Sequence, residues 1–133
     1  MSASFELVVD RAFRVLADEL GLTGPAGVDP AAVSYSGPDV SYTITLDPAT
    51  GTVSTVVARD LDGVRLTADL PALVRGAALG NPAAVPCGAR SLPEMRATVA
   101  AQAVYVRRLQ PYLTALNAMP LMRAAHAREL RSA

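Results

Sequence analysis

A stretch of alternating apolar and hydroxyl residues in the middle of the chain constrains the fold more than any other feature. In the run 40–46, VSYTITL, the apolar side chains fall on one side and serine or threonine on the other. This period of two is typical of a strand with one buried and one wet face. A second β-rich run covers 52–59, and the Asp-Gly pair at 62–63 is a hairpin signal that leads into a third run at 64–68. The pattern predicts a three-stranded antiparallel meander, or four strands where the stretch 33–35 joins it.

Helical periodicity flanks the meander on both sides. Apolar residues recur at three- and four-residue steps from Phe5 to Leu20, which predicts a helix with one stripe toward the core. A short helix is predicted over 70–79 with Asp69 as its N-cap, and a longer helix begins at the capping box 91–94, SLPE. Because a meander of this size buries only one face, these helices are expected to cover it.

Prolines and glycines predict where the regular elements end. The Gly- and Pro-rich stretch 23–30 is predicted to be a loop. Pro111 predicts a kink in the last helix, because it removes a backbone donor and crowds the preceding turn. Pro120 predicts a second break, which leaves residues 120–133 as a protruding helical arm. The expected fold is a single α+β domain over residues 1–133: an N-terminal helix, a three- to four-stranded antiparallel meander, a short helix and a long proline-kinked C-terminal helix.

The residue types argue against most catalytic chemistry. The chain has one cysteine, Cys87, and one histidine, His126, and nothing in the sequence brings this thiol and its required base together. Zinc draws several nitrogen or sulfur ligands, which these two residues do not supply. Asp60 and Asp62 begin like a calcium loop, but the remaining ligand positions are missing and the turn interpretation is preferred. We therefore expect no catalytic, cofactor-binding or metal-binding residues, and no cofactor.

The sequence also predicts a cytoplasmic protein without a membrane partner. Its first residues show neither a basic run nor an apolar leader segment. No apolar run approaches the roughly 20 residues that span a bilayer. A lone cysteine forms no internal disulfide, which suits a reducing compartment.

Charge is spread unevenly, although the net charge is zero. Residues 1–89 carry five Arg and ten Asp or Glu, a balance of −5, whereas residues 90–133 carry seven Arg and two Glu, a balance of +5. Complementary charge steers association and selects partners, so this split favours a protein-binding surface. Arginines near Tyr105 and Tyr112 would also suit nucleic acid, but the neutral overall charge disfavours that partner.

Three segments of the chain carry a family resemblance. The opening helix with Phe5 and Phe13, the run 40–47 and the segment 66–70, LTADL, are together similar to small uncharacterised actinobacterial α+β proteins. Some of those proteins are similar to immunity or accessory proteins of toxin and phage-defence loci. The resemblance covers roughly residues 4–80 and transfers no functional residues.

The C-terminal region is the predicted partner-binding surface. Methionine and leucine give it an adaptable apolar stripe, and a small sheet does not easily absorb an arm after Pro120. The predicted function is a non-enzymatic protein-binding or accessory protein, immunity- or adaptor-like, that binds a protein partner or a second copy of itself as a homodimer. The candidate partner-binding residues are Arg107, Arg108, Tyr112, Met119, Leu121, Met122 and Arg123.

The alternative is a small-molecule-binding protein or a cofactor-free enzyme with a pocket between sheet and helices. A curved sheet closed by helices can leave an apolar pocket with a few polar groups in its wall. The candidate polar groups are Tyr35, Asp39, Tyr42, Arg59 and Arg65.

Overall fold

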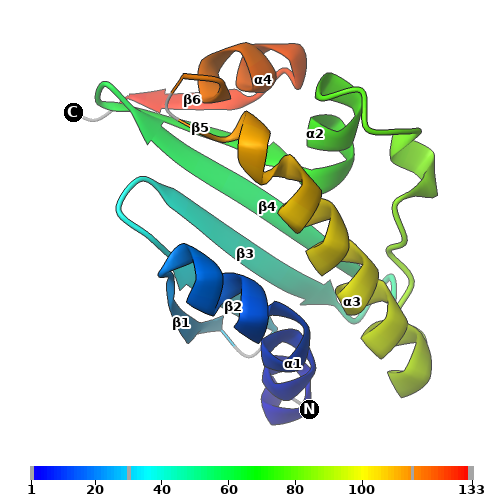
Figure 1. Cartoon of the computed structure of the whole chain (residues 1–133). Helices are drawn as coiled ribbons and strands as arrows, with labels where there is room; N and C mark the ends of the chain where they lie inside the picture. The colour runs from blue at the N-terminus through cyan, green and yellow to red at the C-terminus, as the bar shows by residue number, and fades with distance from the viewer. Residues whose placement is uncertain (1, 30, 115, 132–133) are drawn as a thin grey trace.

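The computed structural model describes residues 2–29, 31–114 and 116–131. Within these ranges the protein is α+β, with four α-helices and a six-stranded antiparallel sheet (Figure 1). The helices are α1 (Ser2–Leu20), α2 (Leu70–Gly76), α3 (Leu92–Leu109) and α4 (Ala118–Ala124), with 3₁₀ turns η1 (Pro82–Ala84) and η2 (Gln110–Tyr112). The strands are β1 (Thr23–Asp29), β2 (Ala32–Ser36), β3 (Val40–Asp47), β4 (Thr52–Leu61), β5 (Val64–Asp69) and β6 (Arg128–Arg131).

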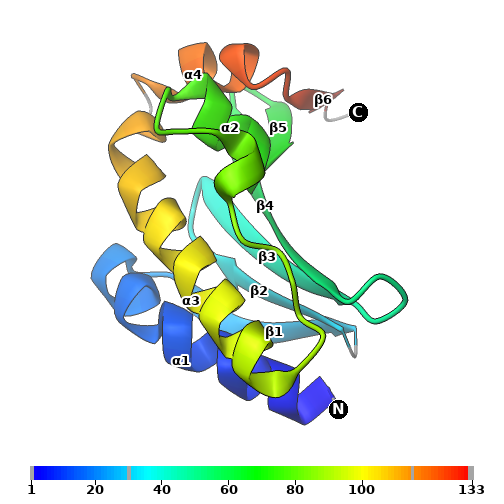
Figure 2. The ribbon, with the colours of Figure 1, turned by 90° about the vertical axis from the view of Figure 1, so that its right-hand side faces the viewer.

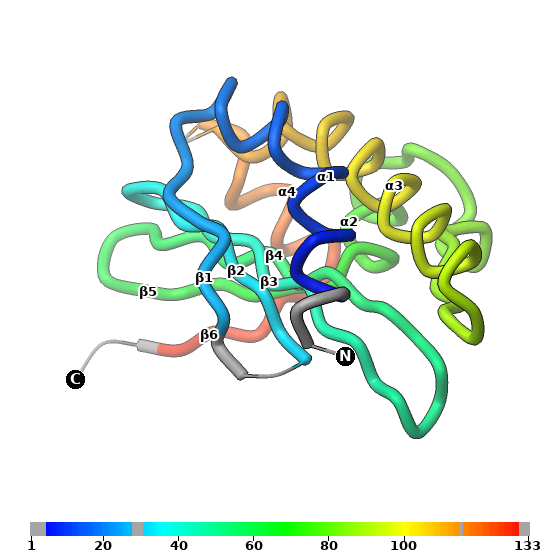
Figure 3. Tube along the Cα trace, turned by 90° about the horizontal axis from the view of Figure 1, so that it is seen from below, coloured from blue at the N-terminus to red at the C-terminus, as the bar shows by residue number. Residues whose placement is uncertain are grey.

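The strands lie in the sheet in chain order, from β1 to β6, and each neighbouring pair is antiparallel. Strand β6 returns from the C-terminal region to pair with β5, with Thr67 opposite Arg128. Helices α1 and α3 lie side by side across one face of the sheet, and α2 and α4 pack together near β5 (Figures 1 and 2). Seen from below, the described helices all lie on one side of the sheet (Figure 3). The architecture is therefore two layers, with the opposite face of the sheet open.

The alternation in β3 decides which face of the sheet is buried. Tyr42 and Ile44 are fully buried under the helices, while Ser41 and Thr43 on the other face are partly exposed. Burying each large apolar side chain contributes about 1.5–3 kcal/mol. This confirms that the hydroxyl face of the strand is the wet one. One hydrophobic cluster connects all four helices to the sheet, and its largest members include Phe5, Val9, Phe13, Tyr35, Leu66, Leu70, Leu73, Leu109 and Met122.

The hairpin predicted at Asp62-Gly63 is confirmed. The two residues join β4 to β5, and Leu61 pairs with Val64 directly before and after them. Both turn residues have positive φ, 51° for Asp62 and 78° for Gly63. Aspartate and glycine adopt this conformation more readily than other residues, which explains why the dipeptide is a reliable signal.

Both predicted helix starts are also confirmed. The Asp69 carboxylate accepts a hydrogen bond from the Ala72 amide at 2.9 Å, and the Ser91 hydroxyl accepts one from the Glu94 amide at 3.2 Å. These bonds satisfy amide groups that a helix N-terminus otherwise leaves unpaired. The end of the short helix differs, because α2 stops at Gly76 rather than at residue 79.

The strand count is the first correction to the predicted fold. Residues 23–30 are predicted to be a loop, but Thr23–Asp29 form β1 and pair with β2. Pro25 and two register shifts make this edge strand irregular. Its glycines and proline are therefore those of a bulged edge strand, although the same composition is typical of a loop. Residue 30 lies outside the described ranges. With β6 at the opposite edge, the sheet has six strands instead of three or four.

The C-terminal region is the second correction. Helix α3 ends at Leu109 and is followed by the 3₁₀ turn that contains Pro111, so it does not continue through a kink. Residues 120–131 do not protrude as a helical arm: Pro120 lies in the first turn of α4, where proline is tolerated, and the following β6 extends the sheet. Helix α4 approaches α2 closely at Gly76, where an added Cβ would lie 3.1 Å from the backbone nitrogen of Ala125. The last two residues of the predicted arm are outside the described ranges.

Candidate protein-binding surface

Helices α1 and α3 form a groove on the outer surface of the helical layer. The groove has a volume of about 360 Å³. Because a helix repeats every 3.6 residues, each of these helices can turn one stripe toward the sheet and another toward the groove. The lining residues are Leu7, Val8, Arg11, Ala12, Leu92, Arg96 and Ala100.

Five large apolar side chains are exposed along these two helices. On α1, Leu7 is 62% exposed, Val15 is 59% exposed and Leu20 is 38% exposed. On α3, Leu92 is 43% exposed and Val104 is 57% exposed. Two of them, Leu7 and Leu92, line the groove, one on each wall. Exposed apolar side chains that gather around one groove are typical of an interaction surface.

Two arginines interrupt the apolar stripes, one on each wall. Arg11 lies between Leu7 and Val15, and Arg96 lies one turn after Leu92. Neither guanidinium has a carboxylate within ion-pair distance among residues 2–29, 31–114 and 116–131. No acidic residue lines the groove itself. The surface therefore combines apolar side chains with positive charge that the described part of the protein leaves uncompensated.

A charged cluster holds α1 against β2. The Tyr35 hydroxyl donates to Asp10 Oδ1 at 2.9 Å, and Arg14 Nη2 donates to the same oxygen at 2.7 Å and to the Gly24 carbonyl at 2.8 Å. Burial works to raise the pKa of Asp10, but the hydrogen bonds from Arg14 and Tyr35 outweigh it and hold this pKa below its usual 3.8. Burial, and then the neighbouring Asp10, raise the pKa of Tyr35 above its usual 10.0. This cluster positions the α1 wall of the groove.

A buried and uncharged cluster holds α3 against β4. Gln102 is buried, and its Nε2 donates to the carbonyls of Val53 at 2.9 Å and Pro86 at 2.8 Å. Its Oε1 accepts from the buried Thr55 hydroxyl at 2.7 Å. Buried polar groups stabilise a fold only when they are paired, and no buried side-chain polar atom lacks a partner in the described part of the chain. The α3 wall is therefore fixed from inside the core.

A second polar contact fixes the end of α3. Gln110 Nε2 donates to the hydroxyl of Tyr42, which is fully buried, and burial raises the pKa of this tyrosine above 10.0. The buried Arg59 donates to the carbonyls of Leu113 at 3.1 Å and Asp39 at 3.2 Å. These contacts tie the segment after α3 to the sheet.

The residues predicted to bind a partner are divided between the core and the surface. Leu121 and Met122 are buried in the hydrophobic cluster, and Met119 is partly buried against it. Tyr112 lines a second groove, of about 520 Å³, between η2, α2 and α4, and Leu121 contributes to the same wall. The structure thus brings Tyr112 and Leu121 together but leaves little of Met122 for a partner.

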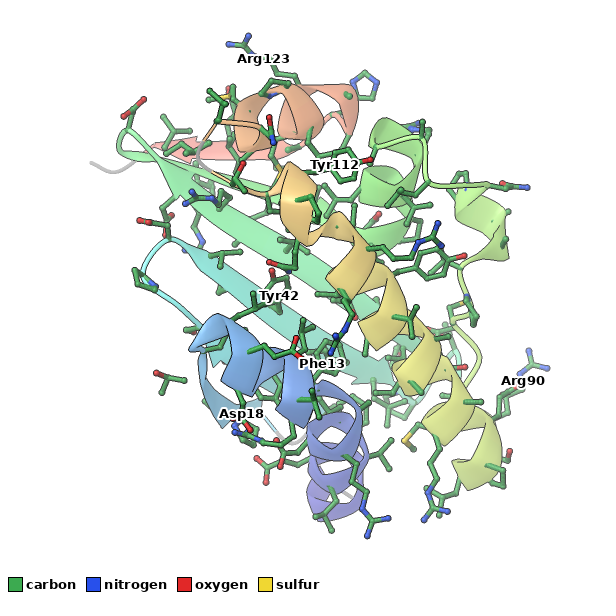
Figure 4. All side chains as sticks on the ribbon, in the orientation of Figure 1. Phe13, Asp18, Tyr42, Arg90, Tyr112 and Arg123 are labelled. Carbon is green, nitrogen blue, oxygen red and sulfur yellow. The ribbon has the colours of Figure 1, made fainter. Side chains whose placement is uncertain are left out.

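The three predicted arginines are exposed at separate places. Arg107 Nη1 lies 3.3 Å from Glu19 Oε2 at the far end of the α1/α3 groove, and the Arg108 guanidinium lies 5.7 Å from the Tyr105 ring centroid. Arg123 points away from α4 into solvent (Figure 4). Only Arg107 therefore lies beside the groove.

The α1/α3 groove itself is not among the predicted site residues. The signal in the sequence is an apolar residue on the polar side of each helix, such as Leu7 on the first and Leu92 on the last long helix. Taken singly, exposed apolar residues are common and need no explanation. They become informative only when the fold shows that α1 and α3 are neighbours.

The polar groups considered for a small-molecule pocket lie apart from one another. Tyr35 is under α1, while Tyr42 and Arg59 are under the end of α3. Arg65 lies on the open face, where it bonds Asp60 and Ser41. Figure 4 shows Phe13 and Tyr42 pointing into the layer between sheet and helices. That layer is filled by buried side chains around these residues, including the Phe13 ring stacked 5.8 Å from Tyr35.

The two residues considered for nucleophilic chemistry lie in different connections. Cys87 is exposed before α3, and its carbonyl accepts from the Val53 amide at 2.8 Å. His126 is exposed between α4 and β6 and lines a shallow groove with Asp69 and Arg128. The described residues contain no hydrogen bond between the two, and no group of three His, Cys, Asp or Glu that could hold a metal ion.

Comparison with known proteins gives no match to a protein-family model, to a curated protein or to a solved structure. The resemblance to actinobacterial immunity or accessory proteins therefore stays a prediction. Across the ranges that the structure describes, no helix combines the length and apolar character needed to cross a membrane.

Proposed function

We propose that this protein is a non-enzymatic accessory protein that binds another protein through the outer face of α1 and α3. The observation that supports the proposal is one groove whose two walls each carry an exposed leucine, Leu7 on α1 and Leu92 on α3. Transfer of apolar surface from water into an interface contributes about 25 cal/mol per Å². A few central apolar anchors usually carry most of the binding energy of such an interface.

The edges of the sheet favour binding through a face over binding through strand addition. The outer strand β1 contains Pro25 and two register shifts, and the outer strand β6 has four residues with Arg128 and Glu129 among them. Proline, bulges, short length and charge are the usual devices that prevent a sheet edge from pairing with another chain. The helical face is the better candidate for that reason.

The charges in the groove favour a different protein over a second copy of this chain. A two-fold interface through the groove would bring Arg11 and Arg96 of both copies together without carboxylates in the groove to separate them. The homodimer predicted from the sequence is therefore not our proposal for this surface. The proposed site of action is the cytoplasm, where an exposed thiol such as that of Cys87 stays reduced.

Site-specific cross-linking in cells of the source organism tests this proposal. A photoreactive amino acid is placed at Ala100, which is exposed and lines the groove, with a matched control at Ser54 on the open face of the sheet. We expect one adduct of defined mass from position 100, absent from position 54 and lost when Leu7→Asp is added. Equal labelling at both positions, or no adduct at position 100, would show that the helical face is not the binding surface.

A further inference from the structure

We infer that the α1/α3 groove takes an amphipathic helix of the partner protein, with acidic residues on both sides of the helix's apolar stripe. The inference rests on the proposed function and adds the chemistry of the occupant. It depends on the shape of the groove, on the spacing of its apolar residues and on the placement of its two arginines.

The shape fits a third helix better than an extended segment. Two helices packed side by side leave a groove along their contact, and a helix fills such a groove by fitting its ridge of side chains between them. At 1.5 Å per residue, the α1 wall from Leu7 to Ala12 extends over about 7.5 Å and the α3 wall from Leu92 to Ala100 over about 12 Å. An occupant of about two helical turns therefore spans both walls.

The arginines place the acidic residues of the occupant. Arg11 is on one wall and Arg96 is on the other, each within an apolar stripe and without an ion-pair partner in the described ranges. A helix lying between them would present its apolar stripe to Leu7 and Leu92 and one flank to each guanidinium. Acidic residues on both flanks of this helix would form ion pairs with both arginines, whereas basic residues there would be repelled by them.

An anionic membrane or a nucleic acid fits the same surface less well. A membrane takes up a protruding apolar ridge, whereas the apolar residues of this surface border a concave groove. A carboxylate already stands beyond one end of the groove, where Glu19 pairs with Arg107 at 3.3 Å. A continuous polyanion that followed the groove would meet this carboxylate, while a short helix ends before it.

Peptide binding to the full chain tests the inference. The probes are two fluorescent 18-residue helical peptides with the same leucine stripe, flanked by glutamate in one and by lysine in the other. We expect the acidic peptide to bind at least about tenfold more tightly, and Arg11→Glu/Arg96→Glu to reverse this preference. The matched control Arg75→Glu/Arg123→Glu changes two exposed arginines on α2 and α4 and should leave the preference unchanged. Circular dichroism and thermal melting establish that each variant is folded.

Each other outcome overturns the inference in a recognisable way. Equal binding of both peptides would show apolar docking without charge selection, while the proposed function stands. Binding of the wild type, but not of the doubly reversed variant, to phosphatidylserine vesicles, with no peptide binding, would make a lipid surface the occupant. Absence of binding to both peptides and vesicles would reject the acidic helix, and the cross-linking at position 100 would decide separately whether a protein binds this face.

Discussion

The two helices that form the groove are attached to the sheet by different chemistry. Helix α1 depends on a partly exposed charged cluster, in which Asp10 accepts from both Arg14 and Tyr35. Helix α3 depends on Gln102, a buried amide that bonds two backbone carbonyls and Thr55. Exposed ion pairs contribute little and are screened by salt, whereas a buried neutral network is insensitive to salt and costly to break. Both helices also bury apolar side chains, so solution conditions affect only the polar part of the α1 attachment, whereas the polar part of the α3 attachment does not respond to them.

The largest expected effect comes from the buried anchor. Gln102→Leu leaves two carbonyls and the Thr55 hydroxyl without their partner inside the core, and should lower the free energy of unfolding by about 2–4 kcal/mol. Urea denaturation followed by circular dichroism measures this loss. The control is Thr55→Ser, which keeps the hydroxyl that donates to Gln102. A loss below about 1 kcal/mol for Gln102→Leu would mean that the buried network is not the main attachment of α3.

The contact at the end of α3 should have a smaller effect. Tyr42→Phe removes the hydroxyl that accepts from Gln110 but keeps the buried ring, so we expect a loss of about 1 kcal/mol in the free energy of unfolding. The same denaturation experiment measures it. A loss larger than that of Gln102→Leu would place the stronger attachment at the end of the helix instead of its middle.

The charged anchor of α1 should contribute least and should respond to salt. Asp10→Asn and Tyr35→Phe, combined in a double-mutant cycle, are expected to show a coupling of about 0.5–1 kcal/mol at low ionic strength. Arg14→Gln should lower the free energy of unfolding slightly, and its effect should shrink in 1 M NaCl. An unchanged effect of Arg14→Gln in high salt would contradict the contrast between the two anchors.

The two anchors should also differ in how their contributions to stability depend on pH. The pKa of Asp10 is lower in the folded protein than its usual 3.8, so its contribution to stability is present above about pH 4 and is lost as the pH falls through the folded value. The difference in unfolding free energy between wild type and Asp10→Asn should therefore shrink from pH 6 to pH 2.5. The effect of Gln102→Leu should stay constant over this range, because no ionisable group takes part in its hydrogen bonds. Parallel changes in both variants would refute this separation.

The sequence predicts elements that local chemistry determines. The Asp62-Gly63 hairpin, the caps Asp69 and Ser91 and the wet face of β3 all follow from residue types within a few positions of one another. Strands β1 and β6 cannot be predicted from residue types in this way. An edge strand needs little apolar character, and its strand conformation comes from pairing with its neighbour. The region 23–30 therefore has the composition of a loop although most of it is a strand.

The candidate site cannot be predicted from local sequence patterns for a similar reason. Arg11 and Arg96 are 85 positions apart, and only the packing of α1 against α3 brings them to one groove. Conversely, Leu121 and Met122 have the character of a binding stripe but are buried in the core, because α4 folds back onto α2. Whether an apolar helical residue serves the interior or a partner is decided by which elements become neighbours.

The close approach at Gly76 has a consequence for how the chain can change over evolutionary time. Helix α4 lies against this glycine, and β6 follows α4 after only three residues. A methyl group at position 76 would lie 3.1 Å from the Ala125 backbone nitrogen, so the neighbouring backbone would have to shift by a few tenths of an ångström to accept it. A substitution in α2 would therefore be felt in the segment that returns the chain to β6, about fifty positions later in the sequence.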